Sequence, residues 1–187
     1  MNPTRRLREE HQLILQVLDC FETALAEAVE SGEVHRSVFE PFVKFFQGFA
    51  DQCHHCREED HLFPCMEQAG IPREGGPIGV MLHEHQQARM HVRTISEHLE
   101  AADTGDSDAV QIIFDHGRSY LNLLRAHIDK EDHCLFGMAD QLIQGPQLTS
   151  LNQSYEETES EPEYCAKLKR CRAIADTLIE QYGSVTN

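Results

Sequence analysis

Two segments of the chain repeat one pattern of histidine and glutamate, and this repeat is its strongest chemical signal. The segments from His54 to Phe63 and from His127 to Phe136 both read H-x-x-x-E-x-x-x-L-F without a gap. Four residues advance an α-helix by about 400°. The histidine and glutamate of each segment therefore fall one turn apart on the same stripe. Each of two helices is predicted to present an imidazole beside a carboxylate.

The repeat extends upstream to a pair of residues, Glu10-His11 before the first segment and Glu84-His85 before the second. Two helical hairpins thus carry one histidine on their first helix and H-x-x-x-E on their second. Counting from the predicted helix ends, to within a residue or two, these side chains meet in one layer of a bundle with a pseudo-twofold axis. The predicted metal ligands are His11, His54, Glu58, His85, His127 and Glu131.

Four imidazoles and two carboxylates suit iron or manganese better than a metal that prefers thiolates. The alternative interpretation, histidines satisfied within a core, requires a coincidental match of two hairpins in residue type, order and spacing. Buried ionisable groups need partners in either case. We expect two iron ions bridged by the carboxylates and by an oxo or hydroxo group, with manganese or zinc as substitutes.

With these motifs the chain resembles the hemerythrin-like family of the histidine-histidine-glutamate (HHE) cation-binding type, over residues 4–143. The resemblance implies a metal-binding four-helix bundle whose ligands are the same six residues. One departure concerns the third helix. The oxygen-carrying members have a second histidine one turn further on, whereas Arg89 follows His85 by one turn here. A fifth histidine is therefore predicted to be missing.

Three further residues are candidates for additional ligands or for hydrogen bonds to the ligands. Tyr120 lies two turns before the second H-x-x-x-E on the same stripe and could supply a phenolate. His55 and Glu59 form a shifted H-x-x-x-E, but the second repeat has Ile128 where His55 would need a counterpart. Glu59 and Asp132 are better interpreted as acids that bind the ligands or face solvent.

A ferritin-like di-iron carboxylate site is the competing bundle interpretation. It needs two E-x-x-H pairs and two further glutamates. Glu58 and His61 form one such pair, but the sequence contains no matching second pair. The count favours the hemerythrin-like interpretation.

The predicted ligand set leaves coordination positions open for small molecules. Four imidazoles, two bidentate carboxylates and an oxygen bridge fill about ten of twelve positions on two six-coordinate metals. The expected partners are small oxidants: dioxygen, nitric oxide or peroxide. One hypothesis is a protein that binds or senses these molecules or iron, and another is a catalase-like enzyme that consumes peroxide. A reversible oxygen carrier is disfavoured by the missing histidine.

Composition narrows the other functions. A formal net charge of -16 repels nucleic acids and anionic membranes. The sequence has no apolar run of membrane-spanning length and starts with charged residues, so we expect a cytoplasmic protein. Seven cysteines, an odd number, predict reduced thiols, and the lone C-x-x-C of Cys53 and Cys56 lacks a second pair.

The elements that position these residues are predicted to be helices, because tryptophan is absent and helix-forming residues dominate. We expect an all-α, up-down-up-down antiparallel four-helix bundle with a shorter C-terminal fifth helix. The first helix should end at Gly32, and the second should start at a Ser37–Glu40 capping box and kink or end at Pro64. The predicted organisation is a bundle over residues 1–146, with helices opening at Pro77 and at Asp106 or Ser107, an acidic polar linker over 147–162, and a docking helix over 163–187.

Overall fold

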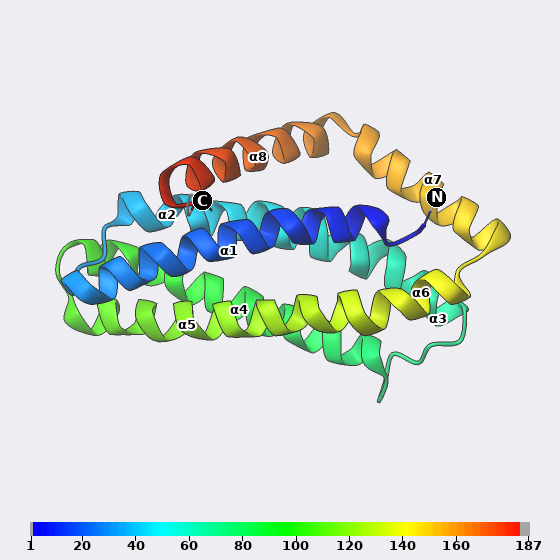
Figure 1. Ribbon diagram of the computed structural model, residues 1–187, viewed down its shortest axis with the longest axis horizontal. Coiled ribbons are helices and arrows are strands. Elements are labelled where there is room, and N and C mark those ends of the chain that lie inside the picture. Colours follow the sequence, from blue (N-terminus) through cyan, green and yellow to red (C-terminus); the bar gives the residue numbers. More distant parts are fainter. Residues whose placement is uncertain (1, 184–187) are drawn as a thin grey trace.

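The computed structural model describes residues 2–183, and within them every regular element is helical, which confirms the predicted all-α class. Figure 1 shows long helical rods side by side, with the C-terminal helices along the outside. The rods are α1 (Arg5–Ser31); α2 (Arg36–Phe45) with the π-helical segments η1 (Phe46–His55) and η2 (Glu58–Leu62) and α3 (Phe63–Gln68); α4 (Pro77–Asp103); and α5 (Ser107–Lys130) with π-helical η3 (Glu131–Leu135) and α6 (Phe136–Leu142). The outer helices are α7 (Gly145–Ser160) and α8 (Pro162–Tyr182).

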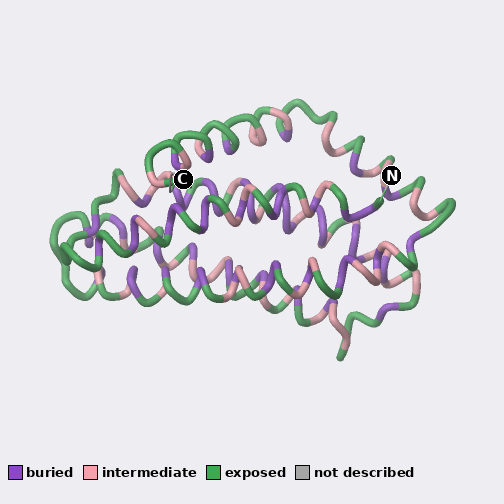
Figure 2. The backbone as a smooth tube through the Cα atoms, viewed as in Figure 1, coloured by how far each residue is buried: buried purple, intermediate pink, exposed green. Residues whose placement is uncertain are grey.

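Buried side chains line the inward faces of the rods (Figure 2) and form two separate apolar clusters along the bundle. On α1 one cluster includes Leu7 and the other begins at Ile14. On α4 the corresponding residues are Met81 and Ala88. A buried histidine lies between the two clusters on both helices. The core is therefore divided by a polar layer at the depth that the histidine repeat predicted.

Three predicted helix ends are confirmed. Gly32 follows α1 with φ of 73°, a left-handed conformation that glycine adopts without a steric penalty. Pro77 is the first residue of α4. The Asp106 side chain accepts hydrogen bonds from the backbone N–H groups of Asp108 and Ala109, which caps α5.

The predicted Ser37–Glu40 capping box is wrong. Helix α2 already begins at Arg36, so Ser37 lies inside its first turn. The backbone N–H of Arg36 instead donates to the Asp103 carboxylate at 2.9 Å. Glu40 pairs with the side chains of Arg36 and Lys44. The cap comes from the end of α4, a tertiary contact that no local pattern encodes.

The second rod continues past Pro64 as far as Gln68. Pro64 lies in the first turn of α3, directly after π-helical η2, where the missing N–H of proline costs little. Gly70, two residues after the end of the rod, has a φ of 100°. The break predicted at Pro64 is thus a change of helix type rather than an end.

Residues 147–162, predicted to be an exposed linker, are largely helical. Helix α7 buries Leu151 and Tyr155, which lie one turn apart, while its other faces are polar. Two apolar residues form too short a stripe to predict a helix from the sequence. The predicted fifth helix is α8, which packs on α1, α2 and η1 and buries Ala175 and Leu178. The last four residues of that predicted segment lie outside the described residues.

Gly48 of η1 lies against α8. A Cβ atom at this position would lie 2.6 Å from Cys171 Sγ on α8. All seven cysteines, Cys171 included, are free thiols. Among the described residues, no helix combines the length and apolarity needed to cross a membrane.

The cap on α2 gives a direct test of the fold. Asp103→Ala should lower the free energy of unfolding by about 1 kcal/mol, because the first turn of α2 loses its acceptor. Ser37→Ala should change it by less than about 0.5 kcal/mol, as an exposed site without a cap role does. Urea unfolding of both variants measures these changes. A larger loss of stability in Ser37→Ala than in Asp103→Ala would instead support the predicted capping box.

Candidate metal centre

The six side chains predicted to bind metal converge in the polar layer, and all are almost completely buried. They form two groups whose potential ligand atoms lie within 4.8 Å of one another. Glu58 and Glu131 belong to both groups. The groups are His11, His54, Glu58 and Glu131, and Glu58, His85, His127 and Glu131. Two carboxylates thus lie between two pairs of imidazoles.

Each central carboxylate faces one histidine from each hairpin. Glu131 Oε2 lies 3.2 Å from His11 Nε2 and 3.3 Å from His127 Nε2. Glu58 lies 3.6 Å from His54 Nε2 and 3.4 Å from His85 Nε2. All four histidines therefore direct the same ring nitrogen, Nε2, toward the centre.

The other ring nitrogen of each histidine binds a second acid. If Nδ1–H donates to that acid, the Nε2 lone pair is free for a metal, the arrangement usual for histidine ligands. The Nδ1–oxygen distances are 2.9 Å for His11 to Asp132, 2.9 Å for His54 to Glu10, 2.7 Å for His85 to Glu59 and 2.9 Å for His127 to Glu84. These four outer acids fix the rotation of all four rings.

The outer acids follow the pseudo-twofold symmetry of the repeat. Glu10 and Glu84 each bind the second histidine of their own hairpin, whereas Glu59 and Asp132 each bind the first histidine of the other hairpin. The interpretation of Glu59 and Asp132 as acids outside the ligand set agrees with these contacts. The roles of Glu10 and Glu84 were missed, although their recurrence before the first histidine was the signal.

The Leu-Phe pair that ends each repeat also has a symmetric role. Phe136 stacks on His11 with ring centroids 5.3 Å apart, and Phe63 stacks on His85 at 5.9 Å. Each phenylalanine thus covers the first histidine of the opposite hairpin. Both rings belong to one apolar cluster, which separates this side of the centre from solvent.

A fifth histidine lies beside the six predicted ligands, although it does not come from the third helix. His55 is 2% exposed, stacks on the ring of His85 at 3.9 Å and forms a third potential ligand group with His85 and His127. Neither of its ring nitrogens has a hydrogen-bond partner among the described residues. His55 is therefore a candidate fifth imidazole ligand from the neighbouring rod, whereas position 89 carries an arginine as the sequence predicted.

The helix type affects where His55 points. In an α-helix, adjacent residues point about 100° apart. His54 and His55 instead end the π-helical segment η1, whose wider turn alters the register of the side chains. Glu58 and Glu131 begin the π-helical segments η2 and η3. Both second helices thus change type where they carry ligands.

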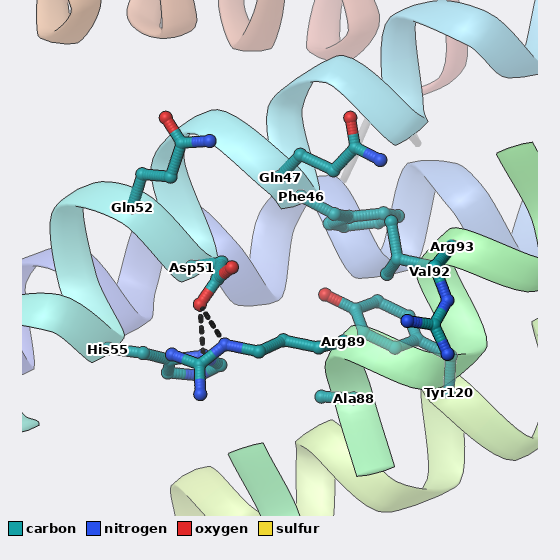
Figure 3. A pocket seen from close by; sticks show the side chains of 10 residues that line it. All are labelled: Phe46, Gln47, Asp51, Gln52, His55, Ala88, Arg89, Val92, Arg93 and Tyr120. Atoms are coloured by element: carbon teal, nitrogen blue, oxygen red, sulfur yellow. Dashed lines mark hydrogen bonds and ion pairs between the residues drawn. The ribbon is translucent and has the colours of Figure 1, made fainter. Parts of the chain in front are cut away.

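Arg89 and Tyr120 lie beside the centre on the His55 side. Arg89 donates to Asp51 at 2.7 Å and to Glu59 at 2.8 Å, so its guanidinium binds acids around the centre. Tyr120 is buried and, with Asp51, His55 and Arg89, lines a cavity of ≈300 Å³ into which its hydroxyl points (Figure 3). Ligation by Tyr120 stays a prediction.

The outer acids are neutralised, but the central ones are not. Each outer acid contacts a basic side chain as well as its histidine: Glu10 contacts Arg57, Glu59 contacts Arg89, Glu84 contacts Lys130, and Asp132 contacts Arg8. Among the described residues, neither Glu58 nor Glu131 is paired with a lysine or arginine. All four oxygens of these two carboxylates are buried without a hydrogen-bond partner.

This environment shifts the pKa values in a way that favours a bound cation. Burial and the neighbouring Glu131 raise the pKa of Glu58 well above its usual value. Burial lowers the pKa values of His54, His55 and His85, which keeps these imidazoles neutral. Burial opposes charge on His11 too, but its hydrogen bond to Asp132 and the nearby Glu131 carboxylate raise its pKa to about 9. The donor set fits metal ions, which would supply the missing positive charge.

Comparison with known proteins agrees with this geometry. A family model described as Hemerythrin HHE cation binding domain matches residues 2–139. The match includes all the residues that converge in the polar layer and ends before α7. Neither the curated proteins nor the solved structures gave a match to the chain.

The buried carboxylate gives a pH-dependent prediction for protein freed of metal by chelation. A folded-state pKa raised above the unfolded value contributes stability below the unfolded pKa of about 4.3 and loses it as pH rises. Glu58→Gln should therefore stabilise the metal-free protein by about 1–3 kcal/mol at pH 7 and by much less near pH 4.5. Thermal unfolding across this range measures the difference, with exposed Glu97→Gln as the control. A gain in stability that does not depend on pH would show that ionisation of Glu58 is not its cause.

Proposed function

The chain belongs to the hemerythrin HHE cation-binding family, and we propose that it binds two iron ions whose open coordination position takes up a small oxidant. The observation that carries the proposal is that two ligand groups share both Glu58 and Glu131. Shared carboxylates hold two cations close together and reduce the repulsion between them. Dioxygen, nitric oxide and peroxide are the candidate oxidants.

The two metal positions would have unequal ligand sets. His11 and His54 would hold one ion, while His55, His85 and His127 would hold the other, and Glu58 and Glu131 would bridge them. The mixture of imidazole and carboxylate ligands supports iron or manganese over a metal that prefers thiolates. With one imidazole fewer, the ion beside His11 and His54 has the larger number of positions free for an exogenous molecule. When bound, the iron pair would supply the electrons that such an oxidant accepts.

The protein around this position controls what reaches it. Phe136 stacks on His11, and the apolar cluster beyond it keeps bulk water away. Asp132 and Glu10 hold the two imidazoles with Nε2 directed inward. A dry position with fixed ligands favours binding of small neutral molecules over exchange with solvent.

His55 also changes the balance between the alternative functions. The case against a reversible oxygen carrier depended on a missing imidazole, and a fifth histidine removes that argument. Peroxide consumption remains the alternative, because an open iron position also permits it. Steady turnover of peroxide by the iron-loaded protein would favour the enzyme, and its absence would favour binding or sensing.

Metal content tests the proposal directly. Protein purified aerobically should contain two iron ions per chain and absorb in the near ultraviolet through ligand-to-metal charge transfer. Elemental analysis and an absorbance spectrum measure both. A chain that retains less than one iron after reconstitution with ferrous iron, or that takes up only zinc, would remove the basis for oxidant binding.

The fifth histidine gives a second prediction. His55→Ala should weaken binding of one of the two metal ions by at least about 10–100-fold. This is the loss of affinity found when residues that only contact a metal ligand are substituted, about 10–100-fold. Arg89→His in the same variant should not restore binding, because the side chain at position 89 extends toward Asp51 and Glu59, outside the three ligand groups. Metal titration of the three proteins decides this, and recovery in the double variant would place position 89 at the metal.

A further inference from the structure

A continuous chain of hydrogen bonds joins the metal centre to the two C-terminal helices. Glu10 binds His54 Nδ1 through one carboxylate oxygen and Arg57 through the other. The Arg57 Nη2 group donates to Glu159 of α7 at 3.1 Å and to the Tyr164 hydroxyl of α8 at 2.5 Å. One arginine thus connects a predicted metal ligand with α7 and α8.

Arg57 differs from the other three bases that pair with outer acids. Its side chain is 2% exposed, whereas the others are at least one-third exposed. The rings of Tyr155 and Tyr164 lie over its guanidinium at 5.6 and 5.8 Å. Burial of this base therefore depends on α7 and α8, while its counterpart in the second repeat, Lys130, forms an ion pair only with Glu84 among the described residues. The other bases are Arg8, Arg89 and Lys130.

The two helices, called here the C-terminal arm (residues 145–182), lie outside the bundle. The family match ends at residue 139, before the arm begins. Helix α7 buries only Leu151 and Tyr155. A cavity of ≈440 Å³ lies between α7 and the second rod, beside His61 and Pro64. Helix α8 packs on α1, α2 and η1, but α7, with so little buried surface, can open locally while the rest of the protein stays folded.

We propose that docking of the C-terminal arm and metal binding beside His11 and His54 stabilise each other, with Arg57 as the positioning residue between them. The docked arm fixes Arg57, which holds Glu10 against His54 and so directs Nε2 of that ring to the centre. A metal ion on Nε2 fixes the same chain of contacts from its other end. Linkage then requires that each event strengthens the other by the same factor. This inference rests on the proposed function.

Hydrogen exchange of the full chain, read by mass spectrometry, tests the coupling. Chelated protein and protein loaded anaerobically with two equivalents of ferrous iron are compared. Amides of α7 and α8 should exchange about 5–150-fold more slowly in the loaded protein, the usual range for coupled sites. In Glu159→Gln the slowing should fall to about twofold or less.

Controls separate the coupling from general stabilisation. Lys130→Gln, at the symmetric position, should keep the full slowing in the arm. Arg57→Gln should behave as Glu159→Gln does, and if it fails to fold, Glu159→Gln carries the test alone. Equal arm exchange with and without two bound irons overturns the coupling and leaves the proposed function intact. Fewer than two bound irons overturns both, and loss of the slowing in Lys130→Gln shows that the effect does not pass through Arg57.

Discussion

Glu58 and Glu131 lie together in the middle of the bundle, where neither carboxylate reaches water. Two such groups in an apolar interior are stable only if they are protonated or neutralised by cations. Burial keeps the imidazoles of His54, His55 and His85 neutral, so these three cannot provide that charge. The four outer acids already have their own basic partners. The rest of the centre is therefore arranged around two carboxylates that have no lysine or arginine partner among the described residues.

This constraint accounts for the organisation of the whole bundle. The polar layer divides the core into two apolar clusters, so each rod must place its polar residues at one depth and apolar residues on both sides. Two copies of one hairpin pattern place the polar residues of all the rods at this depth. Within it, Glu59 and Asp132 link each hairpin to the other, and the stacked phenylalanines cover one side of the layer. The same contacts that orient the imidazoles also join the rods.

Much of the centre could be predicted from sequence because the repeat is local and its helical spacing is regular. His54 and Glu58, with their counterparts on the fourth rod, follow directly from the one-turn spacing. The direction of the His55 side chain could not be predicted, because it depends on a π-helical register that residue types do not specify. The cap from Asp103 is a contact between distant segments. Helix α7 was not predicted because its buried apolar stripe contains only two residues.

Gly48 limits how the sequence can vary while α8 keeps its place. A Cβ at that position would come within 2.6 Å of Cys171 Sγ, and a cysteine side chain has a single rotor with which to withdraw. A residue with a Cβ at position 48 would therefore require Cys171 to change its rotamer or α8 to shift, although position 48 belongs to none of the predicted ligands. The present position of α8 is thus linked to the sizes of residues 48 and 171. A larger residue at 48 would be accommodated without moving α8 only if the side chain at 171 turned away or became smaller.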